Sequence, residues 1–221
     1  MKRIGIYIEA LLSLPKSLYF NFKYFPLATA IKLPVLISYR TKLSKVEGSV
    51  FLEKNKTGII KIGFGYVGIF DKNNSRSIWE CAGHVFFKGA TSIGHGSKLS
   101  IGKNGKLIFG NNFCITAESQ IVCNKKILIG DNVLISWQCL IMDTDFHNIL
   151  NGDIKINDDK EIIIRNNVWI GCRSTILKGV EIYSGNVIAA NTNLTRTIRK
   201  SHIIIGGNPG NIIKENINWS C

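Results

Sequence analysis

Aliphatic residues recur at every sixth position through the second half of the chain. They are Ile129, Ile135 and Ile141 and, after an interruption, Ile164, Ile170, Ile176, Ile182, Ile188 and Leu194. An α-helix repeats about every 3.6 residues and a simple strand about every two, so neither produces this period. A short strand followed by a corner, three times per coil, does produce it. The pattern therefore predicts a parallel β-helix whose narrow interior is filled by these aliphatic side chains.

A second series lies four positions after the first and consists mostly of small residues. Its members are Val133, Cys139, Val168, Ser174, Val180, Asn186, Thr192 and Ile198. We expect them to occupy the tight corners of each coil. We expect nearby glycines to supply backbone freedom there, namely Gly130, Gly171, Gly179 and Gly185.

The repeat continues less regularly toward the N-terminus, through Ile93, Leu99, Phe109, Ile115, Ile121 and Ile127. The shift from Ile127 to Ile129 predicts a two-residue insertion at a corner. We expect an N-terminal extension or cap at residues 1–50, the β-helix at 51–198 with an inserted loop at 143–161, and a C-terminal segment at 199–221. The periodicity does not define the hand of the helix, although parallel crossovers in general favour right-handed connections.

Composition supports strands and a polyanionic partner. Isoleucine occurs 36 times in 221 residues, and β-branched side chains suit pleated, buried surfaces. The 28 basic and 15 acidic residues give a net charge of +13, which favours a nucleic acid, a membrane surface or a phosphorylated cofactor. The sequence contains no zinc-finger spacing, helix-turn-helix pattern or aromatic RNA-binding signature, so we expect no nucleic-acid partner.

The cysteines and the apolar segments favour a cytoplasmic location. Cys81, Cys114, Cys123, Cys139, Cys172 and Cys221 form no C-x-x-C pairs, and no secretory signal peptide precedes them. Free thiols in a reducing compartment are the simplest interpretation. The longest nearly apolar stretch, residues 25–39, is shorter than a membrane span, so we expect no transmembrane helix.

Three segments resemble signatures of the hexapeptide-repeat acyltransferases. They are the NVWIG sequence at 167–171, the LKGVEI sequence at 177–182 and the GGNPGNIIK sequence at 206–214. With the repeat itself, the resemblance covers residues 90–215 in order. It implies an all-β, left-handed parallel β-helix, acetyl-coenzyme A (acetyl-CoA) as co-substrate and a homotrimer. The run at 15–24 is similar to leaders of the acetyltransferases of capsule, lipopolysaccharide and exopolysaccharide pathways.

The interruption of the repeat provides the candidate catalytic group. It begins with Met142-Asp143-Thr144-Asp145-Phe146-His147, in a loop that matches the catalytic loop of the family. Acetyl transfer to a hydroxyl needs a base to take the proton, and imidazole suits this task. His147 is the candidate base. A carboxylate on the other ring nitrogen would fix its tautomer, and both Asp145 and Asp143 are available for that role.

The resemblance also implies binding residues for the co-substrate. Carried over position by position, the coenzyme A contacts fall on Gly171, Cys172, Ala190, Thr195, Arg196, Asn211 and Lys214. Trp169 is a candidate to flank the cofactor, although an aromatic residue in a β-helix often only packs at a corner. Asn211 departs from the basic residue usual at that position, and Arg199 or Lys200 is a cation that can replace it. Asn124 and Trp137, near the coil that leads into the loop, are the candidate acceptor contacts, although both also suit ordinary corner positions.

The remaining histidines do not predict a metal site. The gamma-class carbonic anhydrases share the β-helix and place three histidines around zinc. Here His84, His95 and His202 lie in no matching motif and share no short ligand spacing. We therefore expect no metal requirement.

The first fifty residues contain eight basic and two acidic residues, interleaved with aromatics. This segment suits either a cap on the first coil or a peripheral contact with an anionic membrane. The leading hypothesis for function is transfer of acetyl from acetyl-CoA to a sugar hydroxyl in surface-polysaccharide biosynthesis, in the cytoplasm at the inner face of the membrane. The alternatives are acetylation of a small molecule, such as serine or an antibiotic, and a non-catalytic β-helix that serves as an assembly module.

Overall fold

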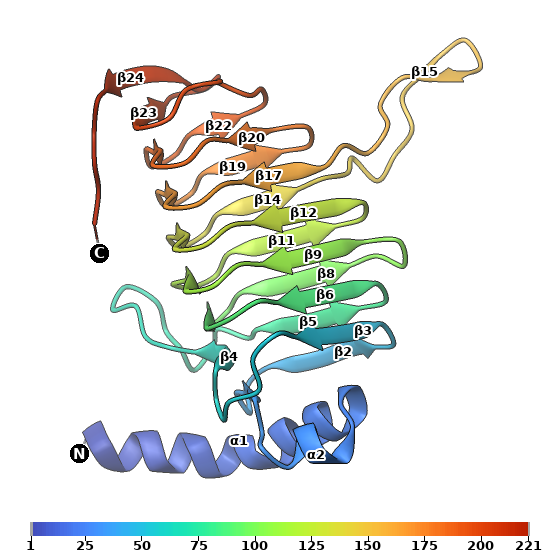
Figure 1. Cartoon of the computed structure of the whole chain (residues 1–221), viewed down its shortest axis with the longest axis vertical. Coiled ribbons are helices and arrows are strands. Elements are labelled where there is room, and N and C mark those ends of the chain that lie inside the picture. Colours follow the sequence, from blue (N-terminus) through green and yellow to red (C-terminus); the bar gives the residue numbers. More distant parts are fainter. Residues whose placement is uncertain (1, 221) are drawn as a thin grey trace.

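The computed structural model describes residues 2–220, with side chains from residue 8 onward; Cys221, one of the predicted free thiols, lies outside this range. The chain winds into a long parallel β-helix, and two helices lie across one end of it (Figure 1). These helices are α1 (Lys2–Tyr24) and α2 (Leu27–Ala30).

Three sheets form the sides of the β-helix, and successive coils pair in parallel. Sheet A contains β1 (Val35–Ile37), β4 (Ile60–Phe64), β7 (Thr91–Gly94), β10 (Phe113–Ile115), β13 (Leu134–Ile135), β18 (Trp169–Ile170), β21 (Val187–Ile188) and β23 (Ile203–Gly206), with β24 (Asn211–Glu215) added antiparallel. Sheet B contains β2 (Lys42–Val46), β5 (Ile78–Cys81), β8 (Lys98–Ile101), β11 (Gln120–Cys123), β14 (Leu140–Met142), β19 (Thr175–Leu177) and β22 (Asn193–Leu194). Sheet C contains β3 (Ser49–Leu52), β6 (His84–Phe87), β9 (Lys106–Phe109), β12 (Lys126–Ile129), β17 (Ile162–Ile164) and β20 (Glu181–Ile182).

The hexad series occupies the interior, as predicted. All nine aliphatic residues of the first series are buried, and so are all members of the second series except the partly buried Ile198. The expected two-residue insertion also appears in the strand register. On sheet B, Ile121 is in register with Ile176 two coils later, and on sheet C, Ile129 is in register with Ile182. The stretch from Ile121 to Ile129 is two residues longer than the stretch from Ile176 to Ile182. The earlier coil therefore has two more residues between sheets B and C.

The corner glycines have two different roles, and only one of them was expected. Gly179 and Gly185 have φ of 80° and 72°, which favours glycine. Gly130 and Gly171 lack a positive φ, so the expectation of backbone freedom is wrong there. A Cβ on Gly171 would lie 2.6 Å from the amide nitrogen of Ala190, so this glycine allows close approach between coils.

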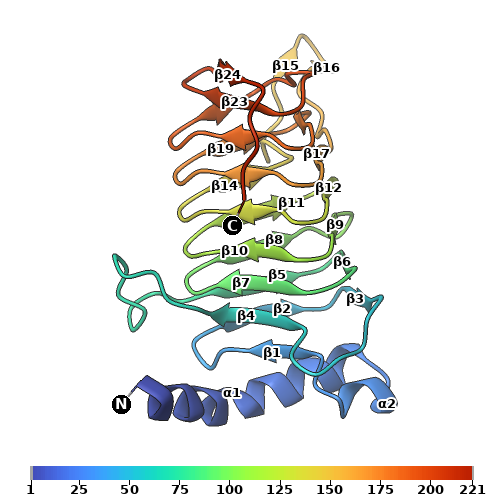
Figure 2. The same cartoon turned by 60° about the vertical axis from the view of Figure 1, so that its left-hand side comes forward.

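The β-helix extends beyond both predicted boundaries. β1 pairs with β4 in parallel, so the first coil begins at Val35 rather than at residue 51. β23 pairs with β21 in parallel, so coils continue to Gly206 rather than ending at residue 198. The first coil was missed because its inward residues do not keep the six-residue spacing. The extension proper is therefore α1 and α2, which lie against β1 at the end of the β-helix (Figure 2).

Candidate active site

The long loop leaves the β-helix at the edge between sheets B and C. β14 ends at Met142 and β17 begins at Ile162, and the segment between them projects as an arm that ends in a hairpin of β15 (Leu150–Asn151) and β16 (Ile154–Lys155) (Figure 1). All other strands of sheets B and C are joined by short corners. The arm is therefore a long loop that projects from a rigid β-helix, and catalytic groups often lie on such loops.

His147 lies in the arm with its side chain exposed and its backbone fixed. Its amide nitrogen donates to the carbonyl of Asp145 at 2.7 Å. Its carbonyl accepts from Nδ2 of Asn157 at 2.8 Å. The imidazole thus projects from an anchored turn, where an acceptor molecule can reach it.

Asn157 organises this turn from a buried position. Its Nδ2 also donates to Oδ2 of Asp145 at 2.8 Å, and its Oδ1 accepts from the amide of Ile149 at 2.7 Å. One side chain therefore ties the segments before and after His147 together. Sequence reasoning missed Asn157 because nothing in its local pattern separates it from the other asparagines of the arm.

Asp145 faces a cation from a neighbouring coil. Lys178 Nζ forms an ion pair with Oδ2 of Asp145 and donates to the carbonyl of Asn157 at 2.8 Å. The hydrogen bonds from Lys178 and then Asn157 hold the pKa of the Asp145 carboxyl below its usual value. Lys178 belongs to the LKGVEI segment, so its motif was visible in the sequence although its partner was not.

Asp143, the other aspartate considered as a partner of His147, has a structural position. Its side chain is fully buried. Oδ1 accepts from the amide of Asn124 at 2.7 Å, and Oδ2 accepts from the amides of Lys125 and Lys126 at 2.9 and 2.7 Å. These three bonds hold the corner between β11 and β12, directly below the arm. The two aspartates that the sequence left equivalent therefore differ in environment.

The two expected acceptor contacts lie on different edges. Asn124 is at the base of the arm, where its Nδ2 donates to Oδ2 of Asp159 at 2.7 Å. Asn124 and Asp159 line an open depression of about 350 Å³ beside the arm. Trp137 is half-buried at the edge between sheets A and B, where its carbonyl accepts from the amide of Arg173 at 3.0 Å.

Three of the residues expected to contact coenzyme A stack at the edge between sheets A and B. Gly171 and Cys172 follow β18, and Ala190 follows β21 one coil later. The amide of Gly171 donates to the carbonyl of Ile188 at 2.8 Å, and the absence of a Cβ leaves room for the coil of Ala190. The result is a narrow strip of small side chains along this edge.

Trp169 lies on β18 beside this strip, with 38% of its surface exposed. Its Nε1 donates to Oγ of Ser136 at 3.1 Å, which fixes the indole. Its ring centroid lies 6.2 Å from that of Trp219 in the C-terminal segment. An indole fixed in this way presents a flat, partly exposed face next to the small residues.

The remaining expected contacts lie toward the C-terminal end. Thr195, Arg196, Asn211 and Lys214 are all exposed. Arg196 Nη2 donates to Oδ1 of Asn211 at 2.8 Å, so the asparagine that departs from the usual basic residue orients an arginine instead. Of the two replacement cations, Lys200 forms an ion pair with Glu215 at 2.6 Å.

The structure does not bring all the predicted site residues together within one chain. His147 projects from the edge between sheets B and C, whereas Gly171, Cys172 and Ala190 lie on the edge between sheets A and B. The predicted base and the predicted coenzyme A contacts thus lie on different edges of a triangular prism.

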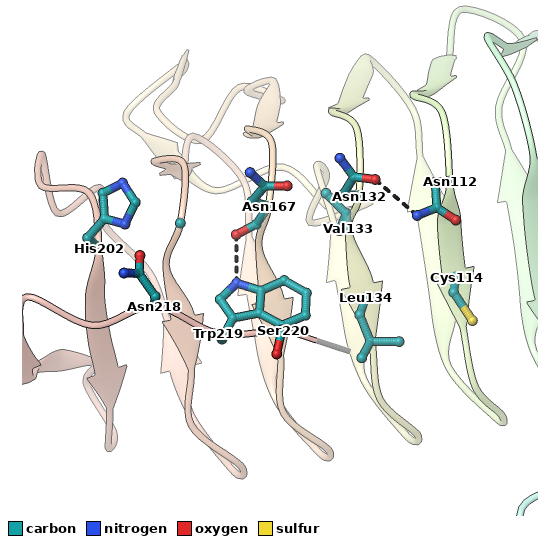
Figure 3. Close-up of a pocket in the computed structure, with 11 residues that line it drawn as sticks. Asn112, Cys114, Asn132, Val133, Leu134, Asn167, His202, Asn218, Trp219 and Ser220 are labelled. Atoms are coloured by element: carbon teal, nitrogen blue, oxygen red, sulfur yellow. Dashed lines mark hydrogen bonds between the residues drawn. The ribbon is translucent and has the colours of Figure 1, made fainter.

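A pocket of about 430 Å³ lies elsewhere. It is at the edge between sheets C and A, beneath the C-terminal segment (Figure 3). Trp219 Nε1 donates there to the carbonyl of Asn167 at 2.8 Å, and Asn112 Nδ2 donates to Oδ1 of Asn132 at 3.0 Å. None of the predicted site residues lines this pocket.

The buried thiols have no nucleophilic character. Burial raises the pKa of Cys139 to about 11 and raises that of Cys123 as well, which keeps both protonated at neutral pH. Cys81, Cys123, Cys139 and Cys172 are free thiols. Between residues 2 and 220, no group of three or more His, Cys, Asp or Glu side chains is arranged to hold a metal ion. Neither helix in that range has the length and hydropathy needed to cross a bilayer.

No family model matches the chain, but similar proteins exist. An uncharacterized 24.8 kDa protein in the cps region of Klebsiella pneumoniae is 28% identical over 193 residues, which cover 85% of this chain and 82% of that protein. The polysialic acid O-acetyltransferase of Neisseria meningitidis is 36% identical over 126 residues, 56% of each chain. The chain spans about half the length of the curated polysialic acid and galactoside O-acetyltransferases that it matches.

A solved structure agrees with the sequence comparison. The polySia-specific acetyltransferase NeuO superposes with a TM-score of 0.55 and 25% identity, covering 82% of this chain and 72% of that one. The fold is thus the left-handed parallel β-helix of the acetyltransferases, as the resemblance implied. The relatives thus include polysialic acid O-acetyltransferases, in agreement with the resemblance to acetyltransferases that the sequence motifs indicated.

Proposed function

We propose that this protein transfers the acetyl group of acetyl-CoA to a sugar hydroxyl in surface-polysaccharide biosynthesis. The observation that carries the proposal is the exposed imidazole of His147 on an anchored arm, in a chain homologous to O-acetyltransferases. Two relatives are named for polysialic acid, and another lies in a cps region. A glycan of the cell surface is therefore the acceptor class that the relatives support.

In the proposed reaction, His147 takes the proton of the acceptor hydroxyl as its oxygen attacks the thioester carbonyl of acetyl-CoA. The tetrahedral adduct then expels the coenzyme A thiolate, to which the proton is returned, and the acetyl ester of the sugar remains. Asn157 and Asp145 act as positioning residues, because they hold the backbone on both sides of His147. Lys178 keeps Asp145 ionised and in place.

The residues on the edge between sheets A and B fit the co-substrate. The strip of Gly171, Cys172 and Ala190 has no long side chains, so a slender chain such as pantetheine can lie along it. Arg196 and Lys214 supply cations for phosphate groups near the C-terminal end, with Asn211 and Thr195 beside them. Trp169 supplies an apolar wall.

We further propose a homotrimer in which each active site is shared between two chains. Within one chain, His147 and the coenzyme A strip lie on different edges of the prism, so a neighbouring chain is needed to bring them together. The arm also exposes large apolar residues suited to a contact with another chain, namely Phe146, Ile149, Leu150, Ile154 and Ile156. A closed ring of three prisms satisfies both conditions.

We place the reaction in the cytoplasm, at the inner face of the membrane. Free thiols at Cys81, Cys123 and Cys139 agree with a reducing compartment. The N-terminal segment is the part of the chain that would make the membrane contact.

The test is acceptor-dependent release of coenzyme A thiol from acetyl-CoA. Candidate acceptors are nucleotide sugars, oligosaccharides including oligosialic acid, serine and chloramphenicol. We expect release with a glycan or sugar acceptor only. Release with serine or chloramphenicol alone would instead assign a small-molecule acetyltransferase, and release with no acceptor of any class would contradict the proposed enzyme.

A further inference from the structure

The helix α1 contacts the β-helix through a row of polar side chains and one buried aromatic residue. Ser17 Oγ accepts from the amide of Ile37 at 2.9 Å, and Asn21 Nδ2 donates to the carbonyl of Val35 at 2.6 Å. Ser13 continues this row just beyond β1. These bonds satisfy the free backbone edge of β1, so the helix caps the first coil. Phe20 is the one large apolar residue buried on this face, with its ring centroid 5.1 Å from that of Trp79; the other fully buried positions between residues 8 and 22 are serine and asparagine.

The opposite face of α1 is apolar. Every exposed position between residues 8 and 22 carries an apolar or aromatic residue, and the largest after Ile8 are Leu11, Leu12, Leu14, Leu18, Tyr19 and Phe22. We call these six residues the base face. Leu11 alone retains 70% of its surface exposed. A contiguous patch of this kind indicates a surface that is covered by a partner.

The base face is oriented away from the β-helix at one end of the molecule. In two views, α1 lies across the end of the β-helix, roughly perpendicular to its long axis (Figures 1 and 2). Since its polar side contacts β1, its apolar side faces away from the molecule. A planar partner can therefore contact the whole length of the helix without meeting the β-helix.

The charges around the base face select the chemistry of that partner. Lys23 directly follows Phe22 of the base face, and Lys32 lies in the turn after α2, which contacts α1; both lysines are exposed. The carboxylate of Glu9, the only acidic residue before residue 47, is already paired with Lys72. The surroundings are thus positive without compensating acid. An anionic surface is attracted to such a rim, whereas a second copy of the same face would meet like charges.

We propose that α1 is an in-plane membrane anchor, which lies on an anionic bilayer with the base face among the acyl chains and with Lys23 and Lys32 at the headgroups. Insertion of one helix face into the interface does not require a transmembrane span. If the chains assemble as the trimer proposed above, their three base faces point to the same side, and the anchors act together.

The experiment is sedimentation of the full-length protein with vesicles. Vesicles of phosphatidylcholine and phosphatidylglycerol should bind the wild type, and vesicles of phosphatidylcholine alone should bind it more weakly. The triple variant Leu11→Gln, Leu18→Gln, Phe22→Gln should lose at least about tenfold in affinity, because three side chains no longer enter the apolar layer. The changed residues are exposed, so circular dichroism should show an unchanged thermal midpoint.

The control variant carries Tyr66→Gln and Ile69→Gln, which alter two exposed apolar residues in the loop between β4 and β5. It should bind vesicles like the wild type. Unchanged vesicle binding by the triple variant would overturn the proposal. So would a reduced particle mass of that variant in light scattering, since the base face would then contact a second copy. Thiol release with a soluble acceptor should be the same in all three proteins, so failure of the anchor and failure of the enzymatic proposal are separable.

Discussion

His147 differs in its surroundings from His84 and His95. His84 is exposed on sheet C, and His95 is fully buried near Phe70. Unlike these two, His147 combines an exposed ring with a turn whose backbone a buried side chain, Asn157, holds at the carbonyl of His147 and the amide of Ile149. A base must reach a substrate and yet stay in place, and this combination meets both requirements.

We predict that His147→Ala lowers acetyl transfer by at least about a hundredfold while leaving coenzyme A affinity largely unchanged, because the base acts on the acceptor proton. Thiol release and calorimetric titration of coenzyme A measure the two quantities. His84→Ala is the matched control and should retain wild-type turnover. Equal turnover of the two variants would remove His147 from the mechanism.

The two aspartates near the arm should respond differently to the same change. Asp143 receives three backbone N–H bonds in a buried site, and Asn in its place would turn an amide group toward those donors. We predict that Asp143→Asn lowers the free energy of unfolding by about 3 kcal/mol. Asp145→Asn should leave the thermal midpoint near that of wild type and lower turnover instead. A wild-type midpoint for Asp143→Asn would contradict the structural role.

At the scale of elements, the sequence predicted the coils whose interior residues repeat regularly. The hexad at Ile129 to Leu194 follows directly from side chains that alternate between the inside of a narrow prism and its corners, so the coils and the loop between them were visible. The first coil and α1 were not visible in this pattern. The buried face of α1 carries Ser13, Ser17 and Asn21 beside Phe20, whereas most of its apolar residues are exposed, so the hydrophobic pattern indicates the wrong side as the one that contacts the protein.

The candidate site was predictable only in part, for a similar reason. His147 and Trp169 lie in segments that resemble family signatures, and a local pattern suffices to find them. Asn157 and Lys178 act through contacts with residues 10 to 33 positions away. Contacts at that range depend on how the arm folds back on the next coil. That geometry leaves no periodic trace in the sequence.

The arm should stay anchored over the whole neutral range of pH. Lys178 lowers the pKa of Asp145, so the anchoring is complete above the ordinary carboxyl value of 3.8 and is lost as the pH falls through the lower value of the folded state. We predict that Lys178→Met accelerates hydrogen exchange of the amide of Ile149 and its neighbours at pH 7, because the anchor is removed. Wild type should show the same acceleration only below about pH 4.

The control for this experiment is Lys88→Met, which removes an exposed lysine directly after β6, far along the chain from the arm. Its exchange pattern in residues 144–157 should match that of wild type. Protection of Ile149 that survives in Lys178→Met at neutral pH would show that Asn157 holds the arm without the ion pair.

At the scale of the whole molecule, the fold distributes its chemistry over separate surfaces. The imidazole projects from one edge of the prism, the strip of small residues follows another, and α1 covers one end. Within one chain, as far as residues 2–220 are described, the first two lie on different edges. Assembly is therefore the step that would turn these surfaces into a site.

We predict that apolar contacts of the arm stabilise this assembly. Ile154 and Ile156 are 72% and 60% exposed in the isolated chain, so their replacement has little effect on the fold of the monomer. Ile154→Gln with Ile156→Gln should shift the protein from trimer to monomer in light scattering and lower thiol release in parallel. Ile213→Gln, which alters an exposed isoleucine on β24, should change neither quantity. A fully active monomer would contradict the shared site.

Complementation between two inactive variants tests the sharing itself. His147→Ala removes the base, and Ala190→Trp fills the strip on the other edge, so each homotrimer should be inactive. In an equimolar mixture of chains, about three quarters of the trimers contain both variants, and each has one interface that joins an intact His147 to an intact strip. Co-expressed chains should therefore recover about a quarter of wild-type turnover. If the site lay within one chain, every chain in the mixture would carry a defect and no activity would return. Recovery near a quarter thus requires that His147 of one chain serve the strip of another.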